Sequence, residues 1–287
     1  MENLALIDSF AEFKEDKNID RVTLMGIIED VFRNMIVKKY GSDDNFDIIV
    51  NPDKGDLEIW RNRIVVKDED VEDSNAEIAY TDAIKIEPDF EVGEEVSEEV
   101  HLIDFGRRAI LSLRQNLISR IQEHDNTDLY NKYKELVGEI ISGEVHHIRN
   151  REVIIIDDMD NEVILPKDQQ IRSDFFRKGD TIRGVVKEVQ LKGMKPRIVL
   201  SRTSPKFLER LFEQEIPEVA DGLIIVKRVE RIPGEKAKVA VESYDERIDP
   251  VGACVGMKGS RIHGIVRELG NENIDVINYT NNLQLFI

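Results

Sequence analysis

Residues 256–259, Gly-Met-Lys-Gly, form the clearest candidate binding site in the sequence, because apolar runs that predict short helices flank them on both sides. Glycines adopt backbone angles that other residues avoid and allow another molecule's backbone to approach closely. A turn between two helices can also direct backbone N–H groups and a lysine at a phosphate. The alternative is a solvated loop lysine. We predict that the turn contacts phosphate through Gly256, Met257, Lys258, Gly259, Ser260 and Arg261.

A second candidate is the segment 177–210, which holds ten Lys and Arg against three Asp and Glu, a local excess of +7. Basic residues gathered in one segment are typical of a surface that faces a polyanion, although an ordinary solvated surface remains the alternative. The residues of this segment that we expect to contact a polyanion are Lys187, Lys192, Lys195, Arg197 and Arg202.

Other residues that could perform chemistry have simpler interpretations. His146 and His147 are adjacent on a predicted strand, so they should point to opposite faces and could not bind one metal ion. The acidic segment 157–162 could hold Mg²⁺, but it contains turn residues and favours a solvated hairpin tip. Cys254 lies among small apolar residues and indicates packing. Trp60 could anchor a partner or pack. We therefore predict no catalytic residue, metal or cofactor, and no enzymatic activity.

Composition limits the class of protein. The 287 residues are 41% apolar, which is enough for two or three modules. The sequence contains no run of about 18 apolar residues, so it predicts no membrane span. Its first residues have no basic segment ahead of an apolar one, which argues against a secretory signal. A single cysteine excludes an intramolecular disulfide and favours a reducing, cytoplasmic location.

The net charge of −18 should repel nucleic acid, but it is unevenly distributed. Residues 1–134 hold 17 Lys and Arg against 32 Asp and Glu, a net −15, whereas residues 135–287 hold 23 against 26, a net −3. The acidic character therefore belongs to the first half, and the second half can still bind a polyanion.

Periodicity predicts an α+β region over residues 1–134. Helical spacing from Leu4 to Phe13 and from Met25 to a stop at Gly41 indicates two amphipathic helices, and two apolar runs around "NPDKGD" indicate a hairpin. After an acidic stretch, 68–104, apolar spacing predicts a long connector helix toward Tyr133.

Residues 135–202 contain five short apolar runs separated by turn residues, which predict a five-stranded OB-fold β-barrel. Residues 203–287 predict a helix, two strands, a helix, the Gly-Met-Lys-Gly turn, another helix and a third strand. A G-x-x-G turn between two helices in that order is typical of a KH domain, whose loop binds about four single-stranded nucleotides. No predicted barrel strand carries Phe or Tyr, although such barrels usually stack bases on aromatic rings.

Several segments together resemble the NusA family of bacterial transcription elongation factors. They are "FGRRAI", "ILPKDQQI", "LSRTSPKFLERLFEQEIPEVADG" and "KVAVESYDERIDPVGACVGMKGSRIHGIVRELGNENIDVINY". The resemblance implies a multidomain α+β protein: an α+β N-terminal domain with connector helix, 1–134, which binds RNA polymerase; an S1-type OB-fold β-barrel, 135–202; and a first KH domain of type II order, 203–287. That family continues with a second KH domain, so we expect the chain to be truncated at Ile287.

The resemblance also implies partners. Core RNA polymerase, nascent single-stranded RNA and other antitermination factors are expected, for a monomer that modulates pausing, termination and antitermination. The alternatives are an RNA-turnover enzyme, since polynucleotide phosphorylase carries KH and S1 modules, and a ribosome-associated adaptor. In the enzyme those modules follow large catalytic domains with KH before S1, which is not the order here.

Overall fold

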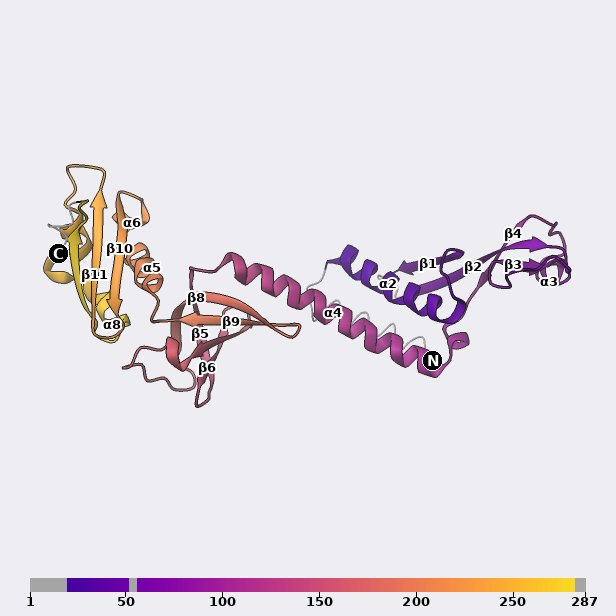
Figure 1. Ribbon diagram of the computed structural model, residues 1–287, viewed down its shortest axis with the longest axis horizontal. Helices are drawn as coiled ribbons and strands as arrows, with labels where there is room; N and C mark the ends of the chain where they lie inside the picture. The colour runs from indigo at the N-terminus through magenta and orange to yellow at the C-terminus, as the bar shows by residue number, and fades with distance from the viewer. Residues whose placement is uncertain (1–19, 52–55, 282–287) are drawn as a thin grey trace. The chain divides into compact units, whose positions relative to one another are not determined.

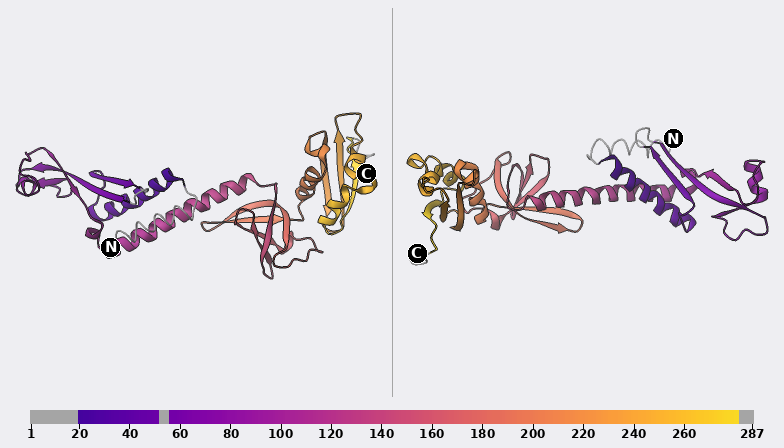
Figure 2. Two further views of the ribbon diagram at one scale, coloured as in Figure 1. Left: turned by 180° about the vertical axis from the view of Figure 1, so that it is seen from behind. Right: turned by 90° about the horizontal axis from the view of Figure 1, so that it is seen from above.

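The computed structural model describes residues 20–51 and 56–281 and contains two compact units, Met1–Asp125 and Asn126–Ile287. Figure 1 shows the elements of both units, and Figure 2 gives two further views. The helix predicted from Leu4 to Phe13 lies outside the described residues. The predicted fold class, a multidomain α+β protein, is confirmed.

The first unit opens with α2 (Arg21–Tyr40), whose ends are set by local sequence. The carboxylate of Asp20 accepts hydrogen bonds from the backbone N–H groups of Val22 and Thr23 at 2.9 and 3.0 Å, which caps the helix. At the other end Gly41 adopts φ 92°, the left-handed conformation that terminates helices, as predicted. The buried face of α2 packs along the first part of α4 (Arg107–Glu135) (Figures 1 and 2).

A four-stranded sheet completes the first unit. Strands β1 (Phe46–Asn51) and β2 (Asp56–Val66) pair in antiparallel fashion, as the predicted hairpin requires. For the acidic stretch 68–104 the sequence indicated only a high negative charge and no secondary structure, yet the stretch forms regular elements. It forms β3 (Glu77–Ala79), α3 (Tyr80–Ile86), β4 (Glu95–Glu99) and η1 (Leu102–Phe105), with β4 pairing β2.

The predicted connector helix is confirmed as α4, and the junction between the two units, Asp125 to Asn126, lies inside it. Leu113, Leu117 and Ile121 belong to the core of the first unit. Tyr133, near the end of the helix, is fully buried in the barrel core of the second unit. One continuous helix therefore contributes to both cores.

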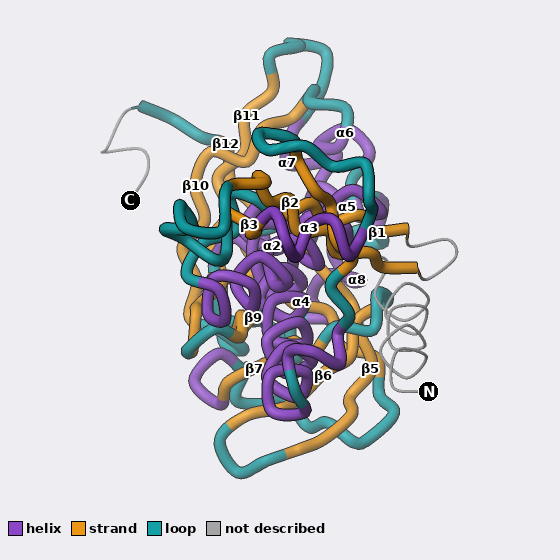
Figure 3. The backbone as a smooth tube through the Cα atoms, turned by 90° about the vertical axis from the view of Figure 1, so that its right-hand side faces the viewer, coloured by secondary structure: helices purple, strands orange, loops and turns teal. Residues whose placement is uncertain are grey.

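The second unit begins with a closed five-stranded barrel in the order β5-β6-β7-β9-β8, which confirms the predicted OB-type barrel. All neighbouring strands are antiparallel except β7 and β9, which are parallel. Figure 3 shows β5, β6, β7 and β9 in orange and loops in teal. The strands are β5 (Ile140–Ile148), β6 (Glu152–Asp157), β7 (Glu162–Pro166), β8 (Thr181–Lys192) and β9 (Lys195–Ser201), with η2 (Lys167–Gln169) after β7.

Helices then cover a three-stranded sheet of order β10-β11-β12. The antiparallel β10–β11 pair and the parallel β11–β12 pair match the predicted KH order. Phe207, Leu211 and Phe212 pack between helix and sheet. The elements are α5 (Pro205–Glu215), α6 (Pro217–Ala220), β10 (Ile224–Ile232), β11 (Lys236–Ser243), α7 (Pro250–Val255), η3 (Met257–Gly259), α8 (Ile262–Glu268) and β12 (Asn273–Asn278).

Candidate nucleic-acid interface

The Gly-Met-Lys-Gly turn lies between α7 and α8, as predicted, and its two central side chains are exposed. Met257 is 89% exposed and Lys258 is also exposed. Three positive φ angles shape the turn: Gly256 has φ 72°, Lys258 φ 55° and Gly259 φ 79°. A lysine in the left-handed region costs free energy, roughly 1 kcal/mol, and such strain is concentrated at functional sites.

The residues after the turn hold it in place. One guanidinium nitrogen of Arg261, Nη1, donates to Glu218 Oε2 at 2.7 Å and to the Ala253 carbonyl at 2.8 Å. His263 Nδ1 lies 2.6 Å from the Gly259 carbonyl oxygen. Ser260 is exposed. Arg261, predicted to contact RNA, therefore ties the turn to α6, and its side chain stays partly exposed.

Of the five basic candidates from segment 177–210, three are exposed on the β8–β9 hairpin. Lys187 lies beside an irregularity in the pairing of β8 and β9, and Lys192 lies directly opposite Lys195 at the hairpin tip. Like charges in directly opposed positions repel each other, so an anion between them is favourable. Arg197, in contrast, is paired with Glu152, with its Nη2 2.7 Å from the carboxylate.

Arg202 is not available to RNA, which corrects the prediction made for it. The residue is 5% exposed, and its guanidinium binds Asp174 through two nitrogens, at 2.9 and 3.2 Å, and Glu268 at 2.6 Å. Burial opposes its charge, but Asp174 and Glu268 outweigh burial and raise the pKa of Arg202. The basic excess of the segment therefore includes a charge that the fold neutralises internally.

This ion-pair network joins the barrel to the KH elements, because Asp174 precedes β8 whereas Glu268 lies in α8. Arg183 of β8 adds a second contact to Glu268, at 2.9 Å. Close backbone approach reinforces the contact: a Cβ on Gly270 would collide with the hydroxyl of Ser173. Barrel and KH elements thus form one compact unit.

A β-bulge corrects the prediction that His146 and His147 point to opposite faces. The pairing of β5 with β6 shifts between Val145 and His147, so strict alternation fails here. The two exposed imidazole rings stack instead, with centroids 4.4 Å apart and planes 5° from parallel. Because the two rings lie in parallel planes, the lone pairs of their nitrogen atoms also lie in parallel planes and do not converge on one metal ion.

Two exposed aromatic residues that could stack on a base were not predicted from the sequence. Phe175, 78% exposed, lies in the loop before β8, and the guanidinium carbon of Arg177 is 5.6 Å from its ring centroid. Tyr244, 68% exposed, follows β11 and has Lys227 Nζ 5.5 Å from its ring. Both residues lie in loops outside the barrel strands, and the sequence shows their aromatic character but not their exposure.

The residues that were considered for other chemistry have structural roles. Cys254 is buried, and burial raises the pKa of its thiol to about 11, so it is not a reactive thiolate. The Asp157 carboxylate accepts hydrogen bonds from the Tyr133 hydroxyl and from the N–H groups of Met159 and Asn161. The acidic segment 157–162 therefore shapes a hairpin turn. Trp60 is half-buried on β2, with its indole N–H donating to Glu58.

Within residues 20–51 and 56–281, no helix combines the length and apolar character needed to span a membrane. No three His, Cys, Asp or Glu side chains in the same described ranges gather where a metal ion could bind.

Comparison with known proteins agrees with this arrangement. Residues 5–127 match the profile of the NusA N-terminal domain, and residues 202–279 match that of the NusA-like first KH domain. A solution structure of the N-terminal domain of NusA from B. subtilis is 25% identical and covers 43% of this chain and 98% of its own, with a TM-score of 0.31.

Curated relatives extend the match along the chain. The transcription termination/antitermination protein NusA of Thermus thermophilus is 35% identical over 86% of this chain and 63% of its own length. NusA of Halalkalibacterium halodurans is 32% identical over 97% of this chain and 72% of its own length. The chain spans 56 to 63% of the length of the first relatives it matches. The curated relatives and the two domain profiles show that this chain belongs to the NusA family of transcription termination/antitermination proteins.

Proposed function

We propose that the chain is a non-enzymatic, RNA-binding transcription elongation factor that modulates pausing, termination and antitermination. Residues 1–134 bind core RNA polymerase, whereas the S1-type barrel, 135–202, and the KH domain, 203–287, contact nascent single-stranded RNA. The protein acts in the cytoplasm as a monomer, and other antitermination factors join it on the polymerase. The role in termination and antitermination is supported by relatives named transcription termination/antitermination protein NusA.

The Gly-Met-Lys-Gly turn carries the RNA-binding part of the proposal. It presents an exposed lysine in a left-handed backbone conformation between two helices, where a phosphate can approach the glycine backbone closely. The barrel hairpin of the same compact unit adds two further exposed cations, Lys192 and Lys195.

The test replaces Met257 and Lys258 with Asp in the full chain. Two carboxylates in the turn should repel the phosphate, so the affinity for single-stranded RNA should fall at least about tenfold, while the thermal midpoint stays unchanged because both side chains are exposed. Fluorescence anisotropy with labelled RNA measures the affinity, and circular dichroism measures the midpoint.

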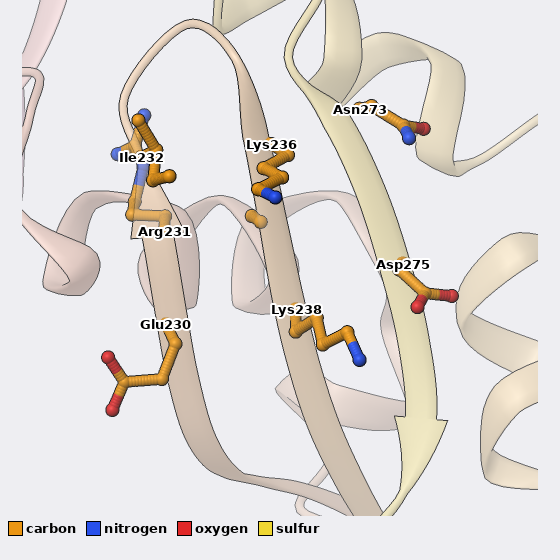
Figure 4. Close-up of a pocket in the computed structure, with 8 residues that line it drawn as sticks. Glu230, Arg231, Ile232, Lys236, Lys238, Asn273 and Asp275 are labelled. Atoms are coloured by element: carbon orange, nitrogen blue, oxygen red, sulfur yellow. The ribbon is translucent and has the colours of Figure 1, made fainter. Parts of the chain in front are cut away.

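A matched control places the same two charges on the open face of the KH sheet. Ile232 and Lys236 are exposed and directly opposed on β10 and β11, and Figure 4 shows their side chains above the sheet, with helices behind it. They border a depression of about 450 Å³ that also contains Glu230 and Asp275. Ile232→Asp with Lys236→Asp should bind RNA nearly as wild type does. Equal losses in both double variants would show a general charge effect and not a clamp at the turn.

A further inference from the structure

We propose that the stacked rings of His146 and His147 form a base-stacking site on the barrel, which holds an unpaired base of single-stranded RNA. The inference rests on the proposed function and adds to it a contact that the KH turn does not supply. It also explains how a barrel without Phe or Tyr in its strands can hold bases.

Geometry is the first argument. The bulge in β5 brings two consecutive imidazoles into an almost parallel stack, and both residues are exposed. Only the inner faces of two stacked rings contact each other, so a further planar ring can extend the stack from an outer face. Base-aromatic stacking is tolerant of sequence because every base has a π-face.

The charge around the pair suits a polyanion. Gly179 N–H donates to the Val145 carbonyl and Val145 N–H to the Asp180 carbonyl, both at 2.9 Å, so the turn 177–180 lies beside β5 just before His146. This turn carries two exposed cationic residues, Arg177 and Lys178. On the other side, the hairpin after His147 carries two more exposed arginines, Arg149 and Arg151.

Two nearby acids are paired with other arginines: Glu152 accepts from Arg197 at 2.7 Å, and Asp174 is bound by buried Arg202. Glu152 also lies 3.4 Å from Arg149 Nη1 and neutralises part of its charge, so Arg177, Lys178 and Arg151 are the cations that favour a polyanion here. Phe175 follows Asp174 and is 78% exposed, so the loop that supplies Arg177 presents a second ring. Stacking surfaces interleaved with exposed cations are the pattern by which proteins hold single strands.

The test separates stacking from phosphate binding in the full chain. Wild type and the double variant His146→Ala with His147→Ala are titrated with a single-stranded RNA of about 12 nucleotides and with the same backbone carrying abasic sites. Loss of the platform should weaken binding of the base-containing RNA about fivefold or more and leave binding of the abasic RNA unchanged. Phe at both positions should restore binding.

A control and four contrary outcomes complete the test. His101→Ala removes an exposed histidine from the first unit, with 62% of its side chain exposed, and should change nothing. An equal loss on both RNAs, or failure of Phe to restore binding, would contradict stacking. Unchanged binding by the alanine variant overturns this inference alone, whereas no binding of either RNA by wild type overturns the proposed function with it.

Discussion

At the scale of single residues, the ion pair of Glu218 with Arg261 links the KH turn to α6. The hydrogen bond from Arg261 lowers the pKa of Glu218 below its ordinary value of 4.5. A carboxyl group whose pKa is lowered by folding stabilises the fold above its unfolded pKa and loses that contribution as pH falls through the folded pKa. Both side chains are partly exposed, so we expect Glu218→Gln to cost about 0.3–1 kcal/mol at pH 7.

The pH dependence distinguishes the ion pair from simple packing. The difference in unfolding free energy between wild type and Glu218→Gln should be largest at neutral pH. It should shrink as pH falls below about 4.5, where Glu218 protonates in the unfolded chain, and vanish below the lowered pKa of the folded state. Urea titrations across this range provide the measurement. Glu246→Gln changes an exposed glutamate and serves as control; a difference that stays constant with pH would contradict the role of ionised Glu218.

At the scale of elements, the last turn of α4 is anchored in the barrel by the buried hydroxyl of Tyr133. It donates to Asp157, and burial together with this carboxylate raises the pKa of Tyr133 well above its ordinary value. Tyr133→Phe removes a hydrogen bond to a charged acceptor and should destabilise the second unit by about 1.5–3 kcal/mol. Hydrogen exchange of β6 and β7 peptides, measured by mass spectrometry, reports this loss.

The matched control is Tyr130→Phe, which removes a hydroxyl from a half-buried tyrosine of the same helix. Its cost should lie within about 0.5 kcal/mol, as is usual for surface changes. If the two variants accelerate exchange equally, the buried hydroxyl does not anchor α4 to the barrel.

At the scale of the whole molecule, α4 covalently connects an acidic unit with a unit that carries the candidate RNA surface. If one unit binds polymerase, the other is held near the emerging RNA at an effective concentration on the order of mM, and weak RNA affinity is sufficient. Insertion of a protease site between Asp125 and Asn126 allows α4 to be cut after folding. We predict that cutting sharply shortens pause lifetimes in single-round transcription.

The uncut insertion variant is the control for that experiment, because it contains the same extra residues. Added RNA polymerase and RNA are kept at equal concentrations before and after cleavage. Pause lifetimes that survive cleavage would show that the two units act independently, even if each binds its own partner.

Local patterns were sufficient for the elements and for the KH turn. Capping residues, turn glycines and apolar periodicity depend on neighbours within a few positions, so α2, α4, the five barrel strands and the turn at Gly256 could be predicted from sequence. The acidic stretch 68–104 was the exception. Its short strands contain few apolar residues and depend on pairing with β2, which lies far away in sequence.

The identity of the functional side chains depended on tertiary structure wherever burial or register mattered. Sequence determines that Arg202 is basic. Only the packing of the barrel against α8 places it between Asp174 and Glu268, whose carboxylates neutralise its charge. Strand alternation predicted opposite faces for His146 and His147, and the bulge stacked them because pairing with β6 shifts there. Charge and periodicity are properties of the chain, whereas exposure and register arise from contacts between distant residues.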